Sequence, residues 1–192
     1  MILSGLRVAD EPALWSSLGF AVEDGVVRAG GVAIELAGRE AGEGILEWHV
    51  EELASTALPA MGAPVPGDDG AHPNGVSGVD HVVAFTGDFD GAVAALAADG
   101  IEPRRIREAG GGVRQAFYVL GTALLELGGP VEGEGPLRFW GLTLVVEDLD
   151  ALAAQLGDRL GSPRDAVQPG RRIATLRRDA GSSVPLAFIT PR

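Results

Sequence analysis

Short apolar runs broken by turns alternate along this chain with three stretches in which apolar residues recur at helical spacing. Each helical stretch follows an aspartate that can cap a helix (Asp10, Asp88 and Asp148), and Gly19 and Gly100 are suited to end the first two. The apolar runs are bounded by turn residues, which is typical of strands. We predict strands over residues 2–8, 20–22, 26–28, 32–36, 45–53, 79–85, 113–120, 122–127, 139–146, 172–177 and 184–190. This pattern indicates an α+β protein.

The order strand, helix, strands recurs along the chain, and part of the repeat is visible in the letters. GGVAIELAG (residues 30–38) and GTALLELGG (residues 121–129) place glycine, glutamate and leucine at matching positions, which aligns Glu35 with Glu126. Neighbouring repeats bury together a face that none could bury alone. We therefore predict βαβββ modules, the first abbreviated, and a linker rich in Pro, Gly, Ala and Asp. The expected boundaries are 1–56 for the abbreviated module, 57–77 for the linker, and 78–130 and 137–192 for the other two modules.

Composition limits the kind of protein that this chain can be. Apolar residues make up 46% of it, enough for a substantial core, and the absence of cysteine leaves His, Asp and Glu as the available metal ligands. The N-terminal residues carry no basic region followed by a long apolar stretch, so we predict neither a signal peptide nor a membrane span. We expect a cytoplasmic protein with no membrane partner.

The formal net charge of −12 argues against nucleic acid as a partner, because phosphate backbones would be repelled. The arginines are nevertheless clustered. One cluster consists of Arg104, Arg105 and Arg107, and a second one comprises residues 171, 172, 177 and 178. Such clusters are explained either by solvated strand faces that keep sheet edges from pairing or by a site for an anionic substrate.

Two predicted strands carry the residues best suited to chemistry. Side chains alternate along a strand, so His81, Val83 and Phe85 point one way, and Leu124 and Glu126 share a face of their own strand. An imidazole and a carboxylate are half of a divalent metal site. The alternative is a hydrogen-bonded, partly buried histidine beside an ordinary exposed glutamate.

The second and third modules also resemble a known family. The opening DHVV (residues 80–83), the Asp88 cap seven residues beyond His81, and the closing LLELGGP (residues 124–130) are similar to the vicinal oxygen chelate superfamily, the group of glyoxalase I, bleomycin-resistance proteins and extradiol dioxygenases. FWGLTLVVEDLDALAAQL (residues 139–156) resembles the start of a second such module. The resemblance covers residues 78–192 well and the N-terminal module more loosely. It implies a fold in which βαβββ modules form a curved, cup-shaped mixed sheet.

In that family, the histidine of a first strand and the glutamate of a last strand hold a metal at the base of the cup. The resemblance therefore implies that His81 and Glu126 bind a divalent ion (Fe, Mn, Ni, Co or Zn). The C-terminal module departs from this pattern, because Gly141 stands in the place of its histidine and residues 186–188 occupy the region of its glutamate.

The N-terminal module offers candidates for the missing ligands. Glu35 occupies the position that corresponds to Glu126, so this module retains a carboxylate there. Glu35 would be a third ligand or a general base if its module faced the central one. If the central and C-terminal modules pair instead, only two ligands remain. His49 could supply the missing third ligand, or it could be a half-buried surface histidine.

Arg114, Gln115 and Tyr118 share one predicted strand, with Gln115 on the opposite face from the other two, so either set could contact a substrate in the cup. The function implied by the resemblance is a metal-dependent lyase, isomerase or dioxygenase acting on a small oxygen-rich molecule. The alternative is a metal-free protein that binds a small molecule, as bleomycin-resistance proteins do, and the acidity of the chain would suit a cationic ligand. The family also implies a homodimer.

Overall fold

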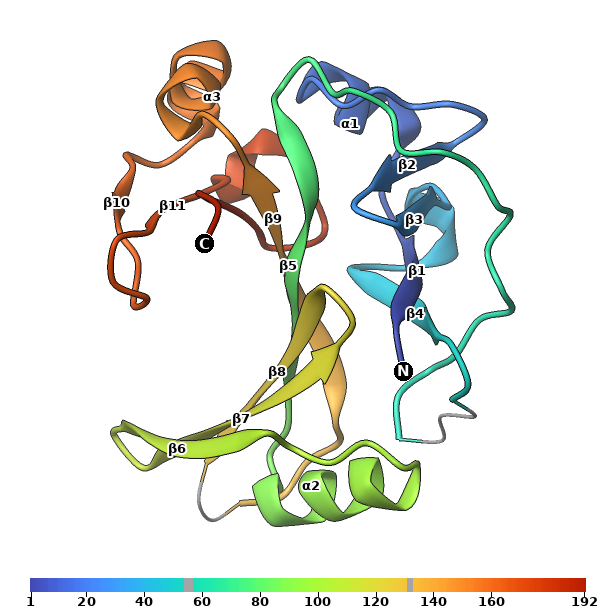
Figure 1. The fold of residues 1–192 in the computed structure, drawn as a ribbon, viewed down its shortest axis with the longest axis vertical. Helices are drawn as coiled ribbons and strands as arrows, with labels where there is room; N and C mark the ends of the chain where they lie inside the picture. The colour runs from blue at the N-terminus through green and yellow to red at the C-terminus, as the bar shows by residue number, and fades with distance from the viewer. Residues whose placement is uncertain (54–56, 131–132) are drawn as a thin grey trace.

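The computed structural model describes residues 1–53, 57–130 and 133–192 and contains two sheets. The N-terminal sheet has four strands in the order β2-β3-β1-β4 (Figure 1). In it β1 and β3 are parallel, and the other neighbours are antiparallel. The elements of this part are β1 (Leu3–Val8), α1 (Pro12–Ser17), β2 (Val26–Ala29), β3 (Val32–Leu36), the 3-10 helix η1 (Arg39–Ala41) and β4 (Ile45–Val50).

The second sheet has eight strands in the order β10-β11-β12-β9-β5-β8-β7-β6. Each half of it runs strand, helix, three strands, with the first and last strands parallel neighbours, and the halves join where β5 and β9 pair antiparallel. The first half consists of β5 (Val76–Phe85), α2 (Phe89–Ala98), β6 (Arg105–Gly110), β7 (Val113–Leu120) and β8 (Ala123–Pro130). The second half consists of β9 (Arg138–Val146), α3 (Leu149–Leu156), η2 (Gly157–Arg159), β10 (Arg164–Asp165), β11 (Arg172–Thr175), η3 (Arg178–Ala180) and β12 (Leu186–Ile189).

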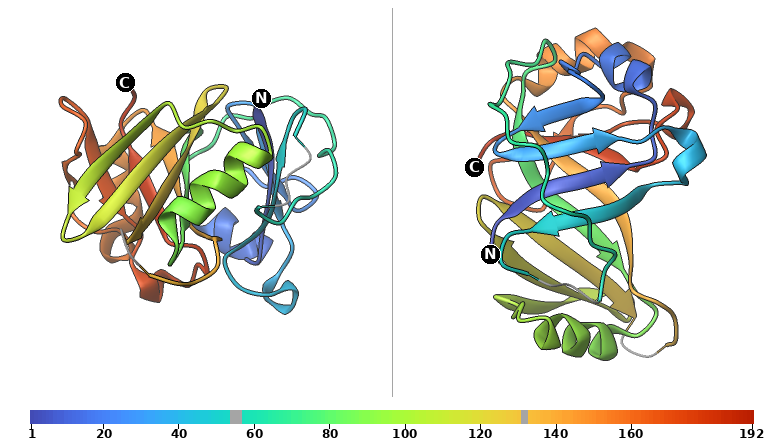
Figure 2. Two further views of the ribbon diagram at one scale, coloured as in Figure 1. Left: turned by 90° about the horizontal axis from the view of Figure 1, so that it is seen from below. Right: turned by 90° about the vertical axis from the view of Figure 1, so that its right-hand side faces the viewer.

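The eight-stranded sheet is strongly curved, and its two edge strands β6 and β10 lie on the same side of the molecule, opposite the four-stranded sheet (Figure 1). The four-stranded sheet lies beside β5 and β9, between the ends of the molecule that carry α2 and α3 (Figures 1 and 2). The predicted α+β class with a curved mixed sheet is confirmed. Within the described residues, no helix is long and apolar enough to cross a bilayer.

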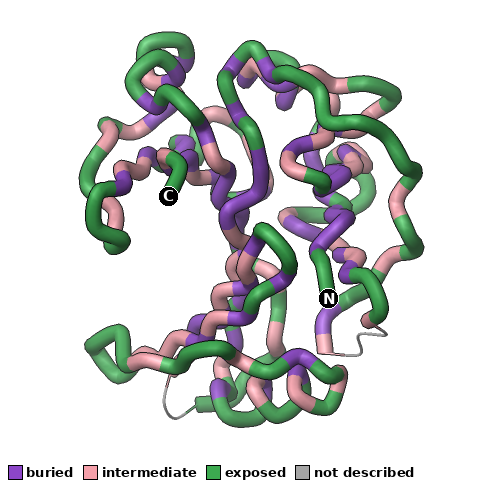
Figure 3. Tube along the Cα trace, in the orientation of Figure 1, coloured by how far each residue is buried: buried purple, intermediate pink, exposed green. Residues whose placement is uncertain are grey.

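The core lies where the two sheets face each other, and the buried positions gather there along β5, β9 and β1 (Figure 3). Trp48 of β4 is 1% exposed and meets Phe139 of β9 edge to face, with ring centroids 5.6 Å apart. The ring centroids of Phe20 and Phe188 of β12 lie 6.4 Å apart, with the two rings tilted by 31°. One continuous apolar cluster therefore joins the N-terminal sheet to the larger one.

Two of the three predicted helix caps are confirmed. The carboxylate of Asp88 accepts a hydrogen bond from the backbone N–H of Gly91 at 2.9 Å, and Asp148 accepts one from Ala151 at 2.9 Å. The prediction for Asp10 was wrong, because α1 begins after Glu11 with no side-chain cap. Asp10 is fully buried, and its carboxylate instead accepts hydrogen bonds from Ser182 and Ser183, which are distant in the sequence.

The segment between β4 and β5 crosses the N-terminal sheet without a helix or strand in its described part. The backbone oxygen of Val65 accepts a hydrogen bond from Arg28, and Asp69 accepts one from the backbone N–H of Gly31 at 2.9 Å. His72 is 7% exposed, and its Nδ1 accepts from the N–H of Ala21 at 3.1 Å while Nε2 lies 3.0 Å from the backbone oxygen of Arg28. Burial lowers the pKa of His72.

Candidate functional site

The concave side of the eight-stranded sheet holds a cavity of about 420 Å³, which we call the cup cavity. Both halves of the sheet contribute to its walls. It is lined by His81 (β5), Glu126 (β8), Gln115 and Phe117 (β7), Arg105 and Arg107 (β6), Arg164 (β10), residues 166–169, Ile173 (β11) and Ile189 (β12). The pairing of the two halves therefore creates a site that neither half contains alone.

Strand register explains why these side chains share one face. Glu126 is paired with Val83 on one side and with Phe117 on the other, and Phe117 is paired with Arg105. Paired residues of neighbouring strands point to the same face of a sheet. The alternate positions of β8, including Leu125, are fully buried on the opposite face. The predicted placement of Glu126 on the concave face follows from this register.

His81 is held by a buried ion pair behind it. Its Nδ1 lies 2.8 Å from Oδ2 of Asp80, and Oδ1 of Asp80 accepts a hydrogen bond from Arg171 at 2.7 Å. The register of β5 against β9 shifts between Val79 and His81, and such a bulge can turn a side chain toward a site. Burial raises the pKa of Asp80, but the hydrogen bonds from His81 and Arg171 outweigh it and lower the pKa to about 2. The ionised carboxylate keeps the proton of His81 on Nδ1, so that Nε2 can act toward the cavity.

Glu126 is held from the other side by a second chain of hydrogen bonds. Arg107 donates through Nε to Oε1 of Gln115 at 2.9 Å, and Nε2 of Gln115 donates to Oε1 of Glu126 at 2.6 Å. A guanidinium group can only donate, so the amide oxygen of Gln115 must face Arg107 and its NH₂ group must face Glu126. Oε2 of Glu126 then lies 3.9 Å from Nε2 of His81.

The geometry of this pair fits a divalent metal ion in part. A separation of 3.9 Å allows one ion to touch both atoms, because bonds from zinc to imidazole nitrogen and carboxylate oxygen are each about 2.0–2.2 Å long. A carboxylate on the second ring nitrogen, as Asp80 provides for His81, is the usual support of a metal-binding histidine. In residues 1–53, 57–130 and 133–192, however, no three His, Asp or Glu side chains converge on one point. The protein would supply two ligands.

Glu35, the expected third ligand, lies in the other sheet. It belongs to β3 of the four-stranded sheet and is paired with Arg7 of β1 and Val26 of β2. The structure therefore does not bring Glu35 to His81. The reason is that the central half of the large sheet pairs with the C-terminal half, through β5 and β9, and leaves the N-terminal module outside the cup.

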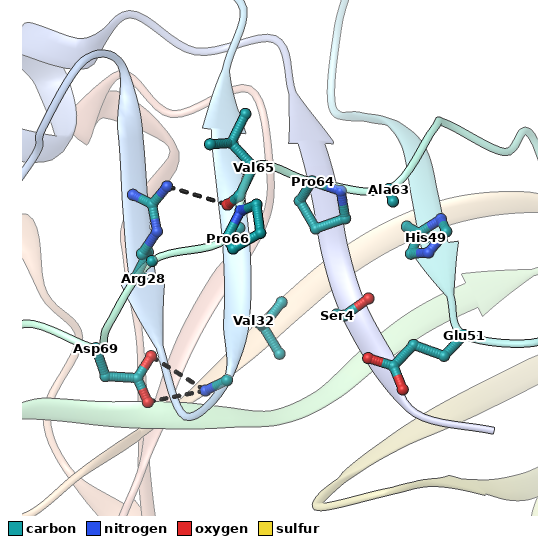
Figure 4. Close-up of a pocket in the computed structure, with 13 residues that line it drawn as sticks. Ser4, Arg28, Val32, His49, Glu51, Ala63, Pro64, Val65, Pro66 and Asp69 are labelled. Atoms are coloured by element: carbon teal, nitrogen blue, oxygen red, sulfur yellow. Dashed lines mark hydrogen bonds between the residues drawn. The ribbon is translucent and has the colours of Figure 1, made fainter.

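His49 likewise lies away from the cup, in a smaller cavity of about 330 Å³ between the N-terminal sheet and the segment that crosses it (Figure 4). Its Nδ1 lies 3.2 Å from the backbone oxygen of Met61. Pro64 of the crossing segment sits over Gly5 of β1, where any larger side chain would meet it. His49 helps to seat this segment, and its position gives it no contact with the cup cavity.

The residues predicted on β7 separate as their alternation requires. Gln115 lines the cup cavity, whereas Arg114 and Tyr118 lie on the helix side of the sheet. Arg114 binds Asp90 of α2 at 2.6 Å and covers the ring of Phe89, with its guanidinium carbon 4.6 Å from the ring centroid. Tyr118 is fully buried, and burial raises its pKa to about 12. The structure thus brings His81, Glu126 and Gln115 together.

Among the other residues at the site, Arg105, Arg107 and Arg171 belong to the two arginine clusters visible in the sequence, whereas Arg164 had no signal of its own. Arg164 lies on a two-residue strand, and Arg171 reaches Asp80 from 91 positions away. Asp80 carried a usable hint, because it directly precedes the candidate ligand His81 in the DHVV segment. Carboxylate support of a metal-binding histidine is common enough to justify testing an adjacent aspartate.

No protein-family model matches the chain, and no curated protein matches it. Among solved structures, methylmalonyl-CoA epimerase from Mycobacterium tuberculosis is 22% identical over 62% of this chain and 90% of that chain, with a TM-score of 0.50. A variant of the Streptomyces coelicolor methylmalonyl-CoA epimerase in complex with 2-nitronate-propionyl-CoA is 24% identical over 60% and 94%, with a TM-score of 0.48. A hypothetical protein from Bacillus halodurans is 15% identical over 59% and 94%, with a TM-score of 0.49. At such identities, the likeness to the M. tuberculosis protein establishes a shared fold.

Proposed function

Because this chain has the fold of the vicinal oxygen chelate superfamily, we propose that it is a divalent-metal-dependent enzyme that acts on a small molecule in the cup cavity. The observation that carries this proposal is the convergence of His81 and Glu126, with Nε2 and Oε2 3.9 Å apart inside one cavity. Both groups are held from behind, by Asp80 and Gln115, as a reactive centre requires.

In this proposal His81 and Glu126 are the metal ligands, and oxygen atoms of solvent or substrate fill the remaining positions. When bound, such an ion acts as a Lewis acid that stabilises negative charge developing on a substrate oxygen. The apolar side chains of Phe117, Ile173 and Ile189 line the same cavity and offer an apolar surface to the non-reacting part of a small molecule. Within this proposal we favour isomerisation, because the M. tuberculosis structure that shares the fold is named an epimerase.

Metal titration tests the proposal directly. We expect the parent protein, dialysed against EDTA, to bind one equivalent of Mn²⁺, Co²⁺, Ni²⁺ or Zn²⁺ in isothermal titration calorimetry, with a matching increase in the melting temperature. His81→Ala and Glu126→Gln should each weaken binding by about tenfold or more, because each removes one of only two protein ligands. Glu35→Gln is the matched control and should bind as the parent does. The proposal fails if the parent binds no stoichiometric metal or if His81→Ala binds as tightly as the parent.

A metal-free binding protein is the second candidate. The observation that favours it is the presence of two, rather than three, converging metal-binding side chains among the described residues. Catalytic zinc sites typically use three protein ligands. If the parent binds small molecules in the cup cavity but no metal in the same titration, this second function replaces the first.

A further inference from the structure

Arginines from both edge strands of the eight-stranded sheet enter the cup cavity. Arg105 and Arg107 come from β6 at one end of the sheet, and Arg164 comes from β10 at the other end. The curvature of the sheet brings these two ends to the same side of the molecule (Figure 1). Residues 59 positions apart in the sequence, 105 and 164, thus line opposite walls of one cavity.

None of these three arginines has a carboxylate within ion-pair distance in the part of the chain that the structure describes, although Arg7, Arg114 and others do. Glu126 is the one acidic residue among the described residues that line the cavity. The walls therefore carry an excess of positive charge, although the whole chain has a formal net charge of −12. A concave site with this local sign attracts anions.

Arg107 is fixed in position before any ligand arrives. Its Nε donates to Gln115 at 2.9 Å, and its guanidinium carbon lies 5.2 Å from the centroid of the Phe117 ring. Its two terminal nitrogen atoms make no hydrogen bond within the described residues, so they are available to a ligand. Such a held guanidinium group binds carboxylate or phosphate oxygens with little loss of side-chain entropy. Gln115 also joins Arg107 to Glu126, so the anionic group would lie beside the pair of His81 and Glu126.

We propose that the molecule bound in the cup cavity carries an oxyanion, a carboxylate or a phosphate, which Arg107 anchors and which Arg105 and Arg164 help to hold from the two walls. This inference rests on the proposed function in that it names the substrate class of the same site. Of the two ligand charges that the sequence left open, it favours the anionic one offered by the arginine clusters over the cationic one offered by the overall charge, because the cavity walls carry an excess of positive charge.

Calorimetry with matched probes tests this proposal on the full chain. After metal ions have been removed with EDTA and the EDTA has been dialysed away, we expect succinate or inorganic phosphate to bind the parent protein, and neutral succinamide to show no binding at the same concentrations. Arg107→Gln should weaken binding by about tenfold or more, since a charge-assisted hydrogen bond is lost, and Arg107→Lys should give an intermediate loss because it keeps the charge without the planar fork. Arg7→Gln removes the same charge from the other sheet and should bind as the parent does. Preference for succinate or for phosphate distinguishes the two kinds of oxyanion.

The proposal is overturned if succinamide binds as well as succinate, if neither anion binds, or if the double variant Arg107→Gln/Arg164→Gln binds like the parent. A failure of the metal-enzyme proposal is read separately. The metal titration of the parent decides that proposal, so an arginine-dependent anion signal without any metal signal identifies an anion-binding protein. Circular dichroism on every variant verifies that its fold is intact.

Discussion

Oδ2 of Asp80 lies 2.8 Å from Nδ1 of His81, while the other oxygen of the same carboxylate binds Arg171 at 2.7 Å. This relationship joins the two halves of the large sheet, because Asp80 belongs to β5 and Arg171 immediately precedes β11. It also decides which ring nitrogen of His81 carries a proton. An ionised carboxylate accepts from N–H, so Nδ1 is the donor and Nε2 keeps the lone pair that a metal or a substrate proton would use.

Asp80→Asn is predicted to weaken the orientation of His81. His81 and Arg171 bind different oxygens of Asp80, and asparagine replaces one of these oxygens by an NH₂ group, which cannot accept from either donor. We expect metal affinity to fall by about 10- to 100-fold. The ¹⁵N shifts of the His81 ring, measured at alkaline pH, should change from a protonated Nδ1 in the parent to a mixture of tautomers in the variant.

Asp150→Asn is the control for that experiment. Asp150 also binds an arginine, Arg172, at 2.7 Å, but the pair is exposed and lies outside the cup cavity. This variant should keep the parent ring shifts and metal affinity. Unchanged ring shifts in Asp80→Asn would show that the carboxylate does not select the tautomer.

His72 is predicted to make stability depend on pH. Its Nδ1 accepts from the N–H of Ala21 and its Nε2 donates to the oxygen of Arg28. The first bond requires the neutral ring, because a protonated Nδ1 cannot accept, whereas the second can form in either state. Burial lowers the pKa of His72 in the folded state below 6.5. The stability that it contributes is therefore fully present above about pH 6.5 and is lost as the pH falls from there through the folded pKa, by up to about 1.4 kcal/mol per pH unit.

Urea unfolding of the parent and of His72→Gln between about pH 8 and pH 5 measures this contribution. The variant should be less stable at pH 8 by about 1–3 kcal/mol, because buried donors and acceptors lose their partners. The difference between the two proteins should shrink as the pH falls. His49→Gln, at a histidine whose Nδ1 lies 3.2 Å from the backbone oxygen of Met61, is measured in parallel as the control for removal of a histidine. A constant difference across the pH range would contradict the prediction.

Asp10 is predicted to be a strong contributor to stability. Its fully buried carboxylate accepts hydrogen bonds from the indole of Trp15 at 3.1 Å and from Ser182 and the backbone of Ser183 at 2.7 Å each. It thereby ties the N-terminal sheet to the loop before β12. Asp10→Ala should lower the free energy of unfolding by about 3 kcal/mol, because several buried donors lose their acceptor.

Urea denaturation measures the free energy of unfolding of Asp10→Ala, with Asp158→Ala measured in parallel as the control. Asp158 is exposed in η2, so its removal should change stability by no more than about 0.5 kcal/mol. If the two variants prove equally stable, the free-energy gain from the hydrogen bonds of Asp10 is cancelled by the cost of burying its carboxylate, and the prediction is wrong.

Local pattern was a reliable guide for β5, β8 and the caps of α2 and α3. Alternation along β5 places His81 and Val83 on one face of that strand. The register pairs Val83 with Glu126 of β8, so His81 and Glu126 lie on the same face of the sheet, as predicted. Asp88 and Asp148 cap their helices because each needs only the next turn of backbone to do so. The edge strand β6 was not predicted, because its exposed, charged sequence has no apolar alternation.

By itself, therefore, the sequence determined the α+β class, the repeated order of strands and helices, and the alternation of side chains between the two faces along β5, β7 and β8. Only the tertiary structure decided which halves share a sheet. That choice excluded Glu35 from the cup, made Asp10 a buried link to the C-terminal loop, and brought Arg107 and Arg164 into one cavity. The physical reason is that an apolar face in the sequence indicates that the face will be buried. It does not indicate which other element will cover it. The partner is selected by packing and charge contacts between residues far apart in the chain.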